Sequence, residues 1–264
     1  MNAWIEIIRP ATSLLAAIGA VVGAVIAGVP FSINFVYVFL AVWFVTGAGM
    51  VINDYYDIEI DRINAPHRPL PSGRISRKNA LSYSVFLFSL GLVFSAFLNV
   101  YCFMLALINC LIEFFYAKKF KKWWLFGNIL VSWLAGSVFI FGGLITFDFR
   151  LIWIVSLLAF LSNMGREIFK AIEDVKGDKK MKLDTLPVSS GTKTAKEIAQ
   201  GFIASAILLS NLPYLSGLLR ASYLKIAALG NAIFFYSLYQ KPDKIKIMTK
   251  VAMLIIVLAI LFSF

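Results

Sequence analysis

The sequence predicts an all-α protein that crosses a membrane many times. Hydrophobic residues make up 60% of its 264 residues and charged residues 15%, and the mean hydropathy is +0.83. Apolar runs of helix-spanning length recur along the whole chain, and the basic residues gather between them. Because a soluble domain of this length would carry far more charge, we expect a multi-pass helical bundle whose partner is the lipid bilayer.

Nine apolar segments are predicted to be transmembrane helices of about 17–23 residues, close to the roughly 20 residues that cross a hydrocarbon core of about 30 Å. They cover residues 9–28, 34–52, 80–98, 100–116, 124–146, 150–170, 198–216, 221–240 and 245–264. The first is expected to be retained, because no small-residue cleavage site follows it. The chain, residues 1–264, is predicted to form a single transmembrane domain with its helices around a central cavity.

Lysine and arginine predict the orientation in the cell membrane. Most of the 25 basic residues follow the second, fourth, sixth and eighth segments, and the other connections hold almost none. The positive-inside rule therefore places the N-terminus and these basic connections in the cytoplasm and the C-terminus outside. The formal net charge is +11, and the basic residues that cause it lie in connections between apolar segments. This distribution indicates membrane topology first and an anionic ligand second, and it argues against nucleic acid as a partner. Cys102 and Cys110 share one apolar segment and are predicted to be buried free thiols.

Two of the basic connections are long and resemble each other. Residues 53–79 and 171–196 each begin with an acidic helix end and continue with a similar Leu-Pro to Ser-Gly stretch, at Leu70–Gly73 and Leu186–Gly191. Long loops on one face of a bundle are usually functional, so both are predicted to be cytoplasmic caps. The similarity predicts an internal repeat, segments two to five and six to nine, with chance similarity as the alternative. In such a repeat the two acidic ends would face each other across the cavity.

The first acidic helix end is a candidate metal site. On a helix that continues past the second segment, Asn53, Asp57 and Asp61 fall on one face at i, i+4 and i+8, with Asp54 beside them. Like charges at this spacing destabilise a helix by a few tenths of a kcal/mol. A hard divalent cation would compensate, and Mg²⁺ favours one or two carboxylates completed by water and substrate phosphates.

The second acidic helix end repeats this pair with Asp174 and Asp178. Charged helix ends are often simply solvated, but two such ends with similar loops on one predicted membrane face favour a shared function. Paired Mg²⁺ sites beside an apolar tunnel suit the ionisation of a prenyl diphosphate, because the metal ions neutralise the leaving group. The helix face that carries Asp174 and Asp178 continues back into the sixth segment with further polar residues, which are Asn163, Arg166 or Glu167, and Lys170. Candidates for completing the neutralisation are Arg68, Arg74, Lys118, Lys121 and Lys170.

Three polar positions inside apolar segments are further candidates. Glu113 is the one carboxylate deep within a predicted span, and Asn109 and Tyr116 share its helix face. Intramembrane ionisable residues usually face a cavity or serve function, so Glu113 is predicted to contact substrate. Tyr116 is predicted to orient the acceptor or shield a carbocation, with hydrogen-bonded packing as the alternative. Asn128, one turn before Ser132, is predicted either to contact the acceptor or to join helices.

These motifs resemble those of the UbiA-type prenyltransferase superfamily. Asn53–Asp61 with Asn64–Gly73 is similar to the family's first motif, and Asp174–Asp178 with Leu186–Gly191 is similar to its second. Further stretches that agree are Arg9-Pro10, Tyr116–Lys121 and Gly127-Asn128. The resemblance therefore covers essentially the whole chain.

Within the superfamily, Arg166–Asp178 is most similar to the archaeal digeranylgeranylglyceryl phosphate synthases. This implies Mg²⁺-dependent transfer of geranylgeranyl from its diphosphate to the free hydroxyl of geranylgeranylglyceryl phosphate, a lipidic phosphate acceptor, which forms the second ether bond of archaeal membrane lipid. The implied catalytic residues are Asn53, Asp57, Asp61, Asp174, Asp178 and Tyr116, and the implied metal ligands are the same residues without Tyr116 and with Asp54. The predicted substrate contacts are Arg9, Arg68, Arg74, Glu113, Lys118, Lys121, Asn128, Asn163 and Lys170.

Ala171 departs from the family pattern, because the synthases that this chain resembles usually carry Asp at that position. Either fewer carboxylates suffice here, or the residue has been altered to weaken turnover.

Other functions also stay open. The acceptor could be an aromatic or tetrapyrrole compound, as in quinone or chlorophyll synthesis. A secondary transporter would share repeats and intramembrane polar groups, but these would lie at mid-depth. A phosphatidyl-alcohol transferase ranks last, because its D-x-x-D-G-x-x-A-R pattern is absent.

Overall fold

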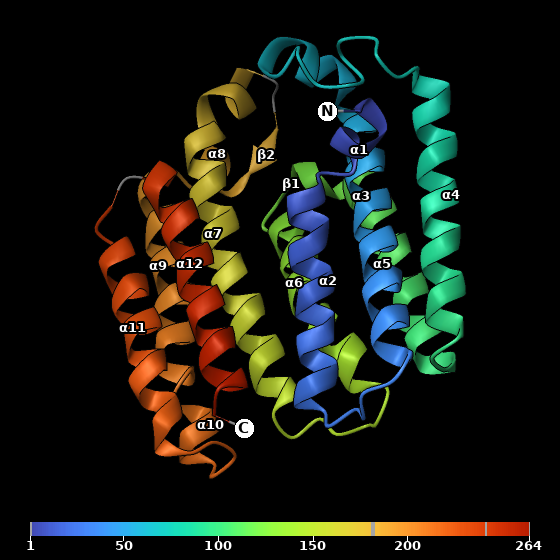
Figure 1. Ribbon diagram of the computed structural model, residues 1–264. Coiled ribbons are helices and arrows are strands. Elements are labelled where there is room, and N and C mark those ends of the chain that lie inside the picture. Colours follow the sequence, from blue (N-terminus) through green and yellow to red (C-terminus); the bar gives the residue numbers. More distant parts are fainter. Residues whose placement is uncertain (1, 181–182, 241, 264) are drawn as a thin grey trace. The chain divides into compact units, whose positions relative to one another are not determined.

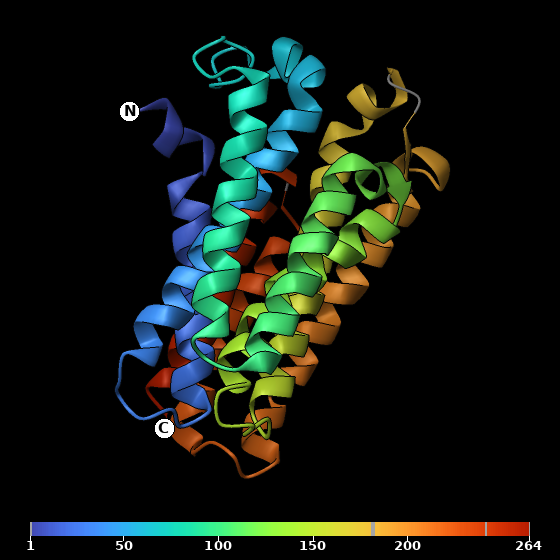
Figure 2. The same ribbon diagram turned by 90° about the vertical axis from the view of Figure 1, so that its right-hand side faces the viewer.

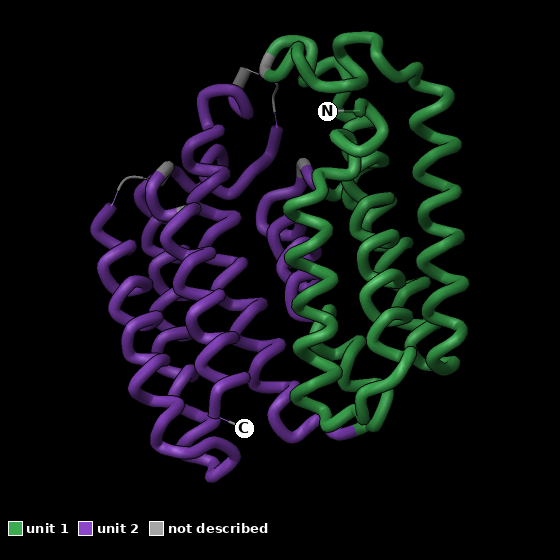
Figure 3. Tube along the Cα trace, in the orientation of Figure 1, with its two compact units in different colours: residues 1–120, 138–147 green, residues 121–137, 148–264 purple. Residues whose placement is uncertain are grey.

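The structure, a computed structural model, describes residues 2–180, 183–240 and 242–263. It is built almost entirely of helices, which confirms the predicted all-α class. The chain divides into two compact units (Figure 3), residues 1–120 with 138–147 and residues 121–137 with 148–264. Two positions of the predicted second cytoplasmic cap, residues 181 and 182, lie outside the described residues.

Unit 1 is organised around one long helix. Its elements are α1 (Ala3–Ile7), α2 (Pro10–Ile26), α3 (Asn34–Asn64), α4 (Arg77–Ala96), α5 (Val100–Lys118) and the last turns of α6 (Phe126–Gly143). The central α3 packs against α2, α4 and α5. Where α4 crosses it, the hydroxyl of Ser84 donates to the carbonyl of Ala48 at 3.1 Å. A loop, residues 65–76, joins α3 to α4 at one end of the unit (Figures 1 and 2).

Polar side chains set the helix starts in unit 1. The hydroxyl of Ser76 accepts from the amide of Asn79 at 3.2 Å and caps α4. Asn99 caps α5, because its Oδ1 accepts from the amide of Cys102 at 2.9 Å, while its Nδ2 donates to the carbonyl of Leu144 at 2.9 Å. One asparagine thus separates two predicted apolar segments that are almost continuous in sequence. Cys102 and Cys110 are buried and free, as predicted.

Unit 2 contains the remaining helices and a minimal sheet. Its elements are the first turns of α6, η1 (Phe120–Lys122, from Lys121 on), β1 (Trp123–Trp124), α7 (Ile152–Lys180), β2 (Asp184–Thr185), α8 (Leu186–Ser189), α9 (Thr192–Leu209), α10 (Leu212–Leu215), α11 (Ala221–Ser237) and α12 (Pro242–Leu261). α7 packs against α9 and α12, and α11 packs against α12. β1 and β2 pair in parallel, with Trp123 opposite Asp184 and Trp124 opposite Thr185.

Each of the nine predicted apolar segments overlaps one long helix, from α2 to α12, within the part of the chain described. Six of these described helices, α3 to α7 and α9, are long and apolar enough to cross a membrane by length and composition, and two further apolar helices, Pro10–Ile26 and Ile247–Leu261, are shorter. α4 leaves large apolar side chains such as Val85 and Phe86 exposed, each at 57%. Such surfaces suit lipid contact. The chain is a multi-pass membrane protein; nine crossings and their orientation stay predictions.

Candidate functional site

The first acidic motif lies on the last three turns of α3. The helix continues beyond its apolar part to Asn64, as predicted. Asp54, Asp57 and Asp61 are buried, with exposures of 2%, 6% and 6%. The side-chain amide of Asn53 donates to Asp57 Oδ2 at 3.0 Å. Buried carboxylates need compensating charge, so the surroundings of these three side chains decide what the site can bind.

Two arginines supply part of that charge. Arg9 Nη2 lies 2.5 Å from Asp54 Oδ1. Arg68 Nη1 donates to both carboxylate oxygens of Asp61, at 2.7 and 2.8 Å, and lies 3.8 Å from Asp54. Burial alone would lower the pKa of Arg68, but the hydrogen bond to Asp61 and the neighbouring carboxylates raise it. The predicted contacts Arg9 and Arg68 are therefore both brought to the predicted carboxylates.

Backbone geometry helps to place Arg9. The residue has a left-handed conformation, φ +48°, and precedes Pro10 at the start of α2. Proline favours the first position of a helix because its φ is already helical and the missing N–H has no partner there. The positive φ of a non-glycine residue is unusual and costs energy. The chain thus turns sharply at the point where the arginine reaches Asp54.

Arg74, another predicted substrate contact, binds Glu6 of α1 and not the carboxylates of the first motif. Its Nη1 and Nη2 donate to Glu6 of α1 at 2.8 and 2.9 Å, and Nη2 also donates to the carbonyl of His67 at 2.6 Å. The hydrogen bond lowers the pKa of Glu6 and raises that of Arg74. Arg74 thus ties the loop to α1, and sequence reasoning missed Glu6 as its partner.

The loops that follow the two acidic motifs share three local features. In the first, Leu70 is buried, Ser72 Oγ donates to the carbonyl of Arg68 at 2.7 Å, and Gly73 has φ +74°. In the second, Leu186 is buried, Ser189 Oγ donates to the carbonyl of Thr185 at 3.2 Å, and Gly191 has φ +85°. Both turns end on a left-handed residue, where glycine fits without strain. The loops differ in that Leu186–Ser189 forms the short helix α8, whereas the first loop consists of turns.

The second acidic motif lies on the last turns of α7. Asp178 Oδ2 accepts from the hydroxyl of Thr185 at 3.0 Å. Lys121 and Lys170 both interact electrostatically with Asp178, and so does Asp174, which is exposed. The pairing of β1 with β2 explains how Lys121 comes near this carboxylate, because Lys121 precedes β1 and Thr185 belongs to β2. The predicted set of Lys121, Lys170, Asp174 and Asp178 is thus brought together within unit 2.

A third group of polar residues lies on α7 before the second motif. The side-chain amide of Asn163 donates to the hydroxyl of Ser132 at 3.3 Å, and both residues are buried. Ser132 therefore joins α6 to α7. Arg166 binds the carboxylate of Glu167, and Lys170 Nζ lies 3.6 Å from the same carboxylate. Lys250 of α12 interacts with all three charged groups and was missed by sequence reasoning.

The predicted intramembrane contact Glu113 is buried on α5. Its carboxylate lies against Gly49 of α3, where an added β-carbon would overlap it. In the described part of the chain, Glu113 Oε2 is buried and accepts no hydrogen bond. Gly49 precedes Asn53 by one turn on the same face of α3, so Glu113 lies about 6 Å along that helix from the first motif.

The remaining predicted site residues lie at the surface or are half-buried. Tyr116, one turn after Glu113, is half-buried, and its predicted role stays a prediction. The ammonium group of Lys118 lies 5.6 Å above the ring of Phe114. Asn128 is half-buried at the start of α6, and Ala171 is half-buried on α7.

The donor set fits Mg²⁺. Within the described residues, no three His, Cys, Asp or Glu side chains form a cluster that would hold a metal alone. Mg²⁺ does not need such a cage, because it takes one or two carboxylates and fills its remaining positions with water and substrate phosphates. Each motif offers hard oxygen donors one helical turn apart, Asp57 with Asp61 and Asp174 with Asp178. These residues can therefore hold Mg²⁺ together with a phosphorylated substrate.

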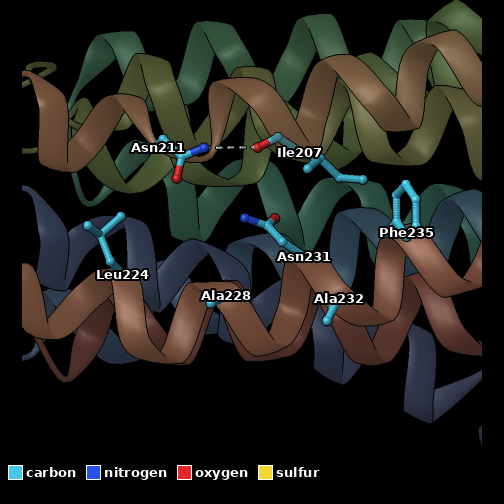
Figure 4. Close-up of a pocket in the computed structure, with 7 residues that line it drawn as sticks. All are labelled: Ile207, Asn211, Leu224, Ala228, Asn231, Ala232 and Phe235. Atoms are coloured by element: carbon cyan, nitrogen blue, oxygen red, sulfur yellow. Dashed lines mark hydrogen bonds between the residues drawn. The ribbon is translucent and has the colours of Figure 1, made fainter.

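A separate cavity lies between α9 and α11 and includes none of the predicted site residues. Its volume is about 580 Å³, and its lining includes Leu224, Phe235 and the amides of Asn211 and Asn231 (Figure 4). Asn231 Nδ2 donates to Ser210 Oγ at 2.8 Å, so this amide serves packing between the two helices. The cavity is wide open and mainly apolar, so it lacks the charge that a diphosphate requires.

The chain is similar to known proteins along nearly its whole length. Residues 16–261 match the UbiA prenyltransferase family. The chain is 40% identical over 239 residues to a digeranylgeranylglyceryl phosphate synthase of Methanosphaera stadtmanae, with 90% of this chain and 88% of the relative covered. It is 39% identical over 250 residues to the synthase of Methanocaldococcus jannaschii, with 92% and 88% covered.

Two solved structures are also similar. One, from a study of digeranylgeranylglyceryl phosphate synthase in membranes, has a TM-score of 0.85 and 38% identity, with 99% of this chain and 97% of that chain covered. A UbiA homologue of Archaeoglobus fulgidus, solved with GPP and Mg²⁺, has a TM-score of 0.79 and 21% identity, with 98% of each chain covered. The second likeness concerns the fold.

Proposed function

The chain belongs to the UbiA prenyltransferase family, and we propose that it transfers a geranylgeranyl group from geranylgeranyl diphosphate to the free hydroxyl of geranylgeranylglyceryl phosphate. That the chain is a membrane prenyltransferase follows from the family and from its relatives, and the predicted resemblance is confirmed. The donor, the acceptor, the use of Mg²⁺ and the cytoplasmic side of the site are parts of the proposal.

The observation that carries the proposal is the burial of three carboxylates, Asp54, Asp57 and Asp61, at the extended end of an apolar helix. Burying several carboxylates together is costly unless cations pair with them. Arg9 and Arg68 satisfy Asp54 and Asp61. Asp57, whose Oδ2 accepts from the side-chain amide of Asn53, lies on the same face as Asp61 and carries oxygen donors of the kind that a divalent cation binds. Such an arrangement suits the recognition of a metal-bound diphosphate.

When bound, Mg²⁺ would neutralise the diphosphate and so make it a better leaving group. The residues of the chain contribute orientation and charge. In the proposal, Asn53, Asp57 and Asp61 hold one side of the metal-bound diphosphate, and Asp174 and Asp178 hold the other. Thr185 fixes the carboxylate of Asp178, and Lys121 adds positive charge beside it. Arg9 and Arg68 neutralise the buried carboxylates of Asp54 and Asp61 and hold them in place.

The transfer breaks the bond between the first prenyl carbon and the diphosphate oxygen and forms a bond between that carbon and the acceptor oxygen. The acceptor hydroxyl loses its proton as or after the new bond forms. Because an alcohol that has attacked a carbocation is strongly acidic, the diphosphate or water can take this proton, and a dedicated base is not required. Water would trap the carbocation, so transfer to the acceptor requires that water be kept away from it.

The choice of acceptor rests on the relatives. The relatives from Methanosphaera stadtmanae and Methanocaldococcus jannaschii are both named digeranylgeranylglyceryl phosphate synthase, and about nine-tenths of this chain aligns with each of them. Binding of GPP and Mg²⁺ by the homologue of Archaeoglobus fulgidus supports a prenyl diphosphate donor and a divalent metal. The excess of basic residues suits an acceptor that is itself anionic.

Labelled geranylgeranyl diphosphate tests the proposal directly. The purified chain in detergent is incubated with it, with Mg²⁺ or EDTA, and with geranylgeranylglyceryl phosphate or an aromatic acceptor. We expect Mg²⁺-dependent formation of the doubly prenylated phosphate and equimolar release of diphosphate. Transfer to the aromatic compound alone would replace the proposed acceptor. Absence of any transfer or diphosphate release, also after Ala171→Asp, would contradict the proposed function.

A further inference from the structure

α7 carries two positive charges on the same face as its carboxylates. Arg166, Lys170, Asp174 and Asp178 follow one another at intervals of four residues, so they form one stripe on the helix. At 1.5 Å per residue, Lys170 lies about 6 Å and Arg166 about 12 Å along the helix axis from Asp174. The stripe therefore changes from negative to positive as it enters the apolar part of unit 2.

One carboxylate holds both cations in place. Glu167 Oε1 accepts from Arg166 Nη1, and Glu167 Oε2 lies 3.6 Å from Lys170 Nζ. The side chains of Arg166 and Glu167 are 18% and 10% exposed, whereas that of Lys170 is 49% exposed. The ion pair of Arg166 with Glu167 is therefore mostly buried, whereas Lys170 lies at the accessible side of this cluster.

A third cation comes from another helix. Lys250 of α12 interacts electrostatically with Arg166, Glu167 and Lys170, and it is exposed. Around Glu167 three cations face one carboxylate, and an anion would compensate this excess of positive charge. In addition, Arg166 Nε is buried and donates to no group that the structure describes. Buried donors without an acceptor are rare and costly, so this nitrogen points to a missing partner.

From these contacts we infer that Arg166, Lys170 and Lys250 bind the phosphate group of the lipid acceptor. The inference rests on the proposed function, in which the acceptor is a phosphate monoester. Such a group carries a charge of about −1.5 to −2 near pH 7, which matches the excess charge of the cluster. The guanidinium fork of Arg166 suits two phosphate oxygens, and the flexible lysines can close on the third.

The position on α7 favours the acceptor over the donor. In the proposed function the diphosphate is held through Mg²⁺ by Asp174 and Asp178, at the other end of the same stripe. The cluster at Arg166 is one to two turns away, and it has more positive than negative charge, so it needs no metal to bind phosphate. Because the donor's diphosphate has similar chemistry, the experiment needs a separate arm for each substrate.

The test compares two acceptors that differ by the phosphate alone, geranylgeranylglyceryl phosphate and geranylgeranylglycerol, with geranylgeranyl diphosphate as the donor. The variant is Lys250→Gln, whose accessible side chain can be changed with little effect on folding. The matched control is Lys244→Gln, an exposed lysine of the same helix. We expect Lys250→Gln to raise KM for the phosphorylated acceptor about ten- to hundred-fold, the effect of one lost charge-assisted hydrogen bond. KM for the donor and for geranylgeranylglycerol should stay within about twofold, a range typical of surface substitutions.

Two further variants separate binding from structure. Lys250→Arg keeps the charge and should retain most of the preference for the phosphorylated acceptor. Arg166→Lys keeps the charge but loses the fork, so it should weaken the same preference while thermal unfolding reports whether the fold survives. An unchanged preference in both Lys250→Gln and Arg166→Lys would overturn the inference. A rise in KM for the donor instead would assign the cluster to the diphosphate and also overturn it.

Failure of this inference is distinguishable from failure of the proposed function. Mg²⁺-dependent diphosphate release by the unmodified chain tests the function without reference to the cluster. Normal release and transfer, combined with an unchanged acceptor preference in the variants, would remove the inference alone. Absence of release would remove the proposed function and the inference with it.

Discussion

The carboxylate of Glu113 on α5 occupies the space beside Gly49 of α3 that a β-carbon would otherwise fill. The contact joins two helices of unit 1 one turn from Asn53, the first residue of the acidic motif. A glycine at position 49 is therefore a condition for burying Glu113 at this depth. The pair connects the packing of the apolar helices with the geometry of the carboxylates.

Gly49→Ala should destabilise the protein by about 1–3 kcal/mol, because an added methyl group forces the Glu113 side chain aside. Glu113→Ala should remove most of that penalty when the two changes are combined, giving a coupling energy of about 1 kcal/mol in a double-mutant cycle of thermal unfolding. Gly201→Ala is the control, since a β-carbon there meets no atom within 4 Å. Additive effects of Gly49→Ala and Glu113→Ala would show that the two residues do not touch in the folded protein.

Arg68→Gln should weaken both stability and donor binding. The arginine pairs with Asp61 and lies near Asp54, so its loss leaves buried carboxylates without a partner. Since Arg68 itself is about one-third exposed, we expect a modest loss of about 1–2 kcal/mol in unfolding free energy and a higher KM for the prenyl diphosphate. Arg62→Gln removes an exposed ion pair with Glu59 and should change neither quantity. Equal effects of the two substitutions would argue against a special role for Arg68.

Ala171→Asp should lower the Mg²⁺ concentration that gives half-maximal activity. Residue 171 lies on α7 three positions before Asp174, and a carboxylate there adds a hard oxygen donor near the second motif. Mg²⁺ titrations of the prenyl transfer rate measure the effect, and Ala171→Asn separates the added charge from the added volume. If Asp and Asn behave alike, the carboxylate at this position is not a metal ligand.

Glu6→Gln should reduce stability near neutral pH but not in acid. The hydrogen bond from Arg74 lowers the pKa of Glu6 below its ordinary value of 4.5 in the folded protein. A group with a lowered folded pKa contributes stability above its unfolded pKa, and this contribution disappears as the pH falls through the folded pKa. The difference between the unmodified chain and Glu6→Gln should therefore be present at pH 7 and vanish below the folded pKa. A difference that is constant with pH would contradict the ion pair.

Much of this site can be predicted from sequence, because the carboxylates sit at helical spacing on apolar helices. Asn53, Asp57 and Asp61 share a face of α3 in any regular helix, and the same holds for Asp174 and Asp178 on α7. The loop turns are also encoded locally, since Gly73 and Gly191 both take the left-handed conformation that ends them. Local rules of helix and turn formation suffice for these features.

Contacts between distant segments could not be derived in the same way. Arg74 binds Glu6, 68 residues earlier in the chain, although its position in the loop suggested a substrate contact. Lys121 comes near Asp178 through a two-residue strand pair that has no pattern of its own in the sequence. Lys250 follows the sequence pattern of a topology-setting lysine, and only the packing of α12 against α7 brings it near Arg166. Such contacts depend on packing, which sequence periodicity does not specify.

The central claim is that the two acidic motifs act on one diphosphate. It is tested most directly by the rate of Mg²⁺-dependent diphosphate release in Asp57→Asn, Asp174→Asn and the double variant, with Glu59→Gln on the exposed side of α3 as the control. If both carboxylates hold the same metal-bound group, each single change should lower the rate by about a hundred-fold or more, and the double variant should be little worse than either. A near-normal rate in either single variant, with the fold intact, would contradict the account.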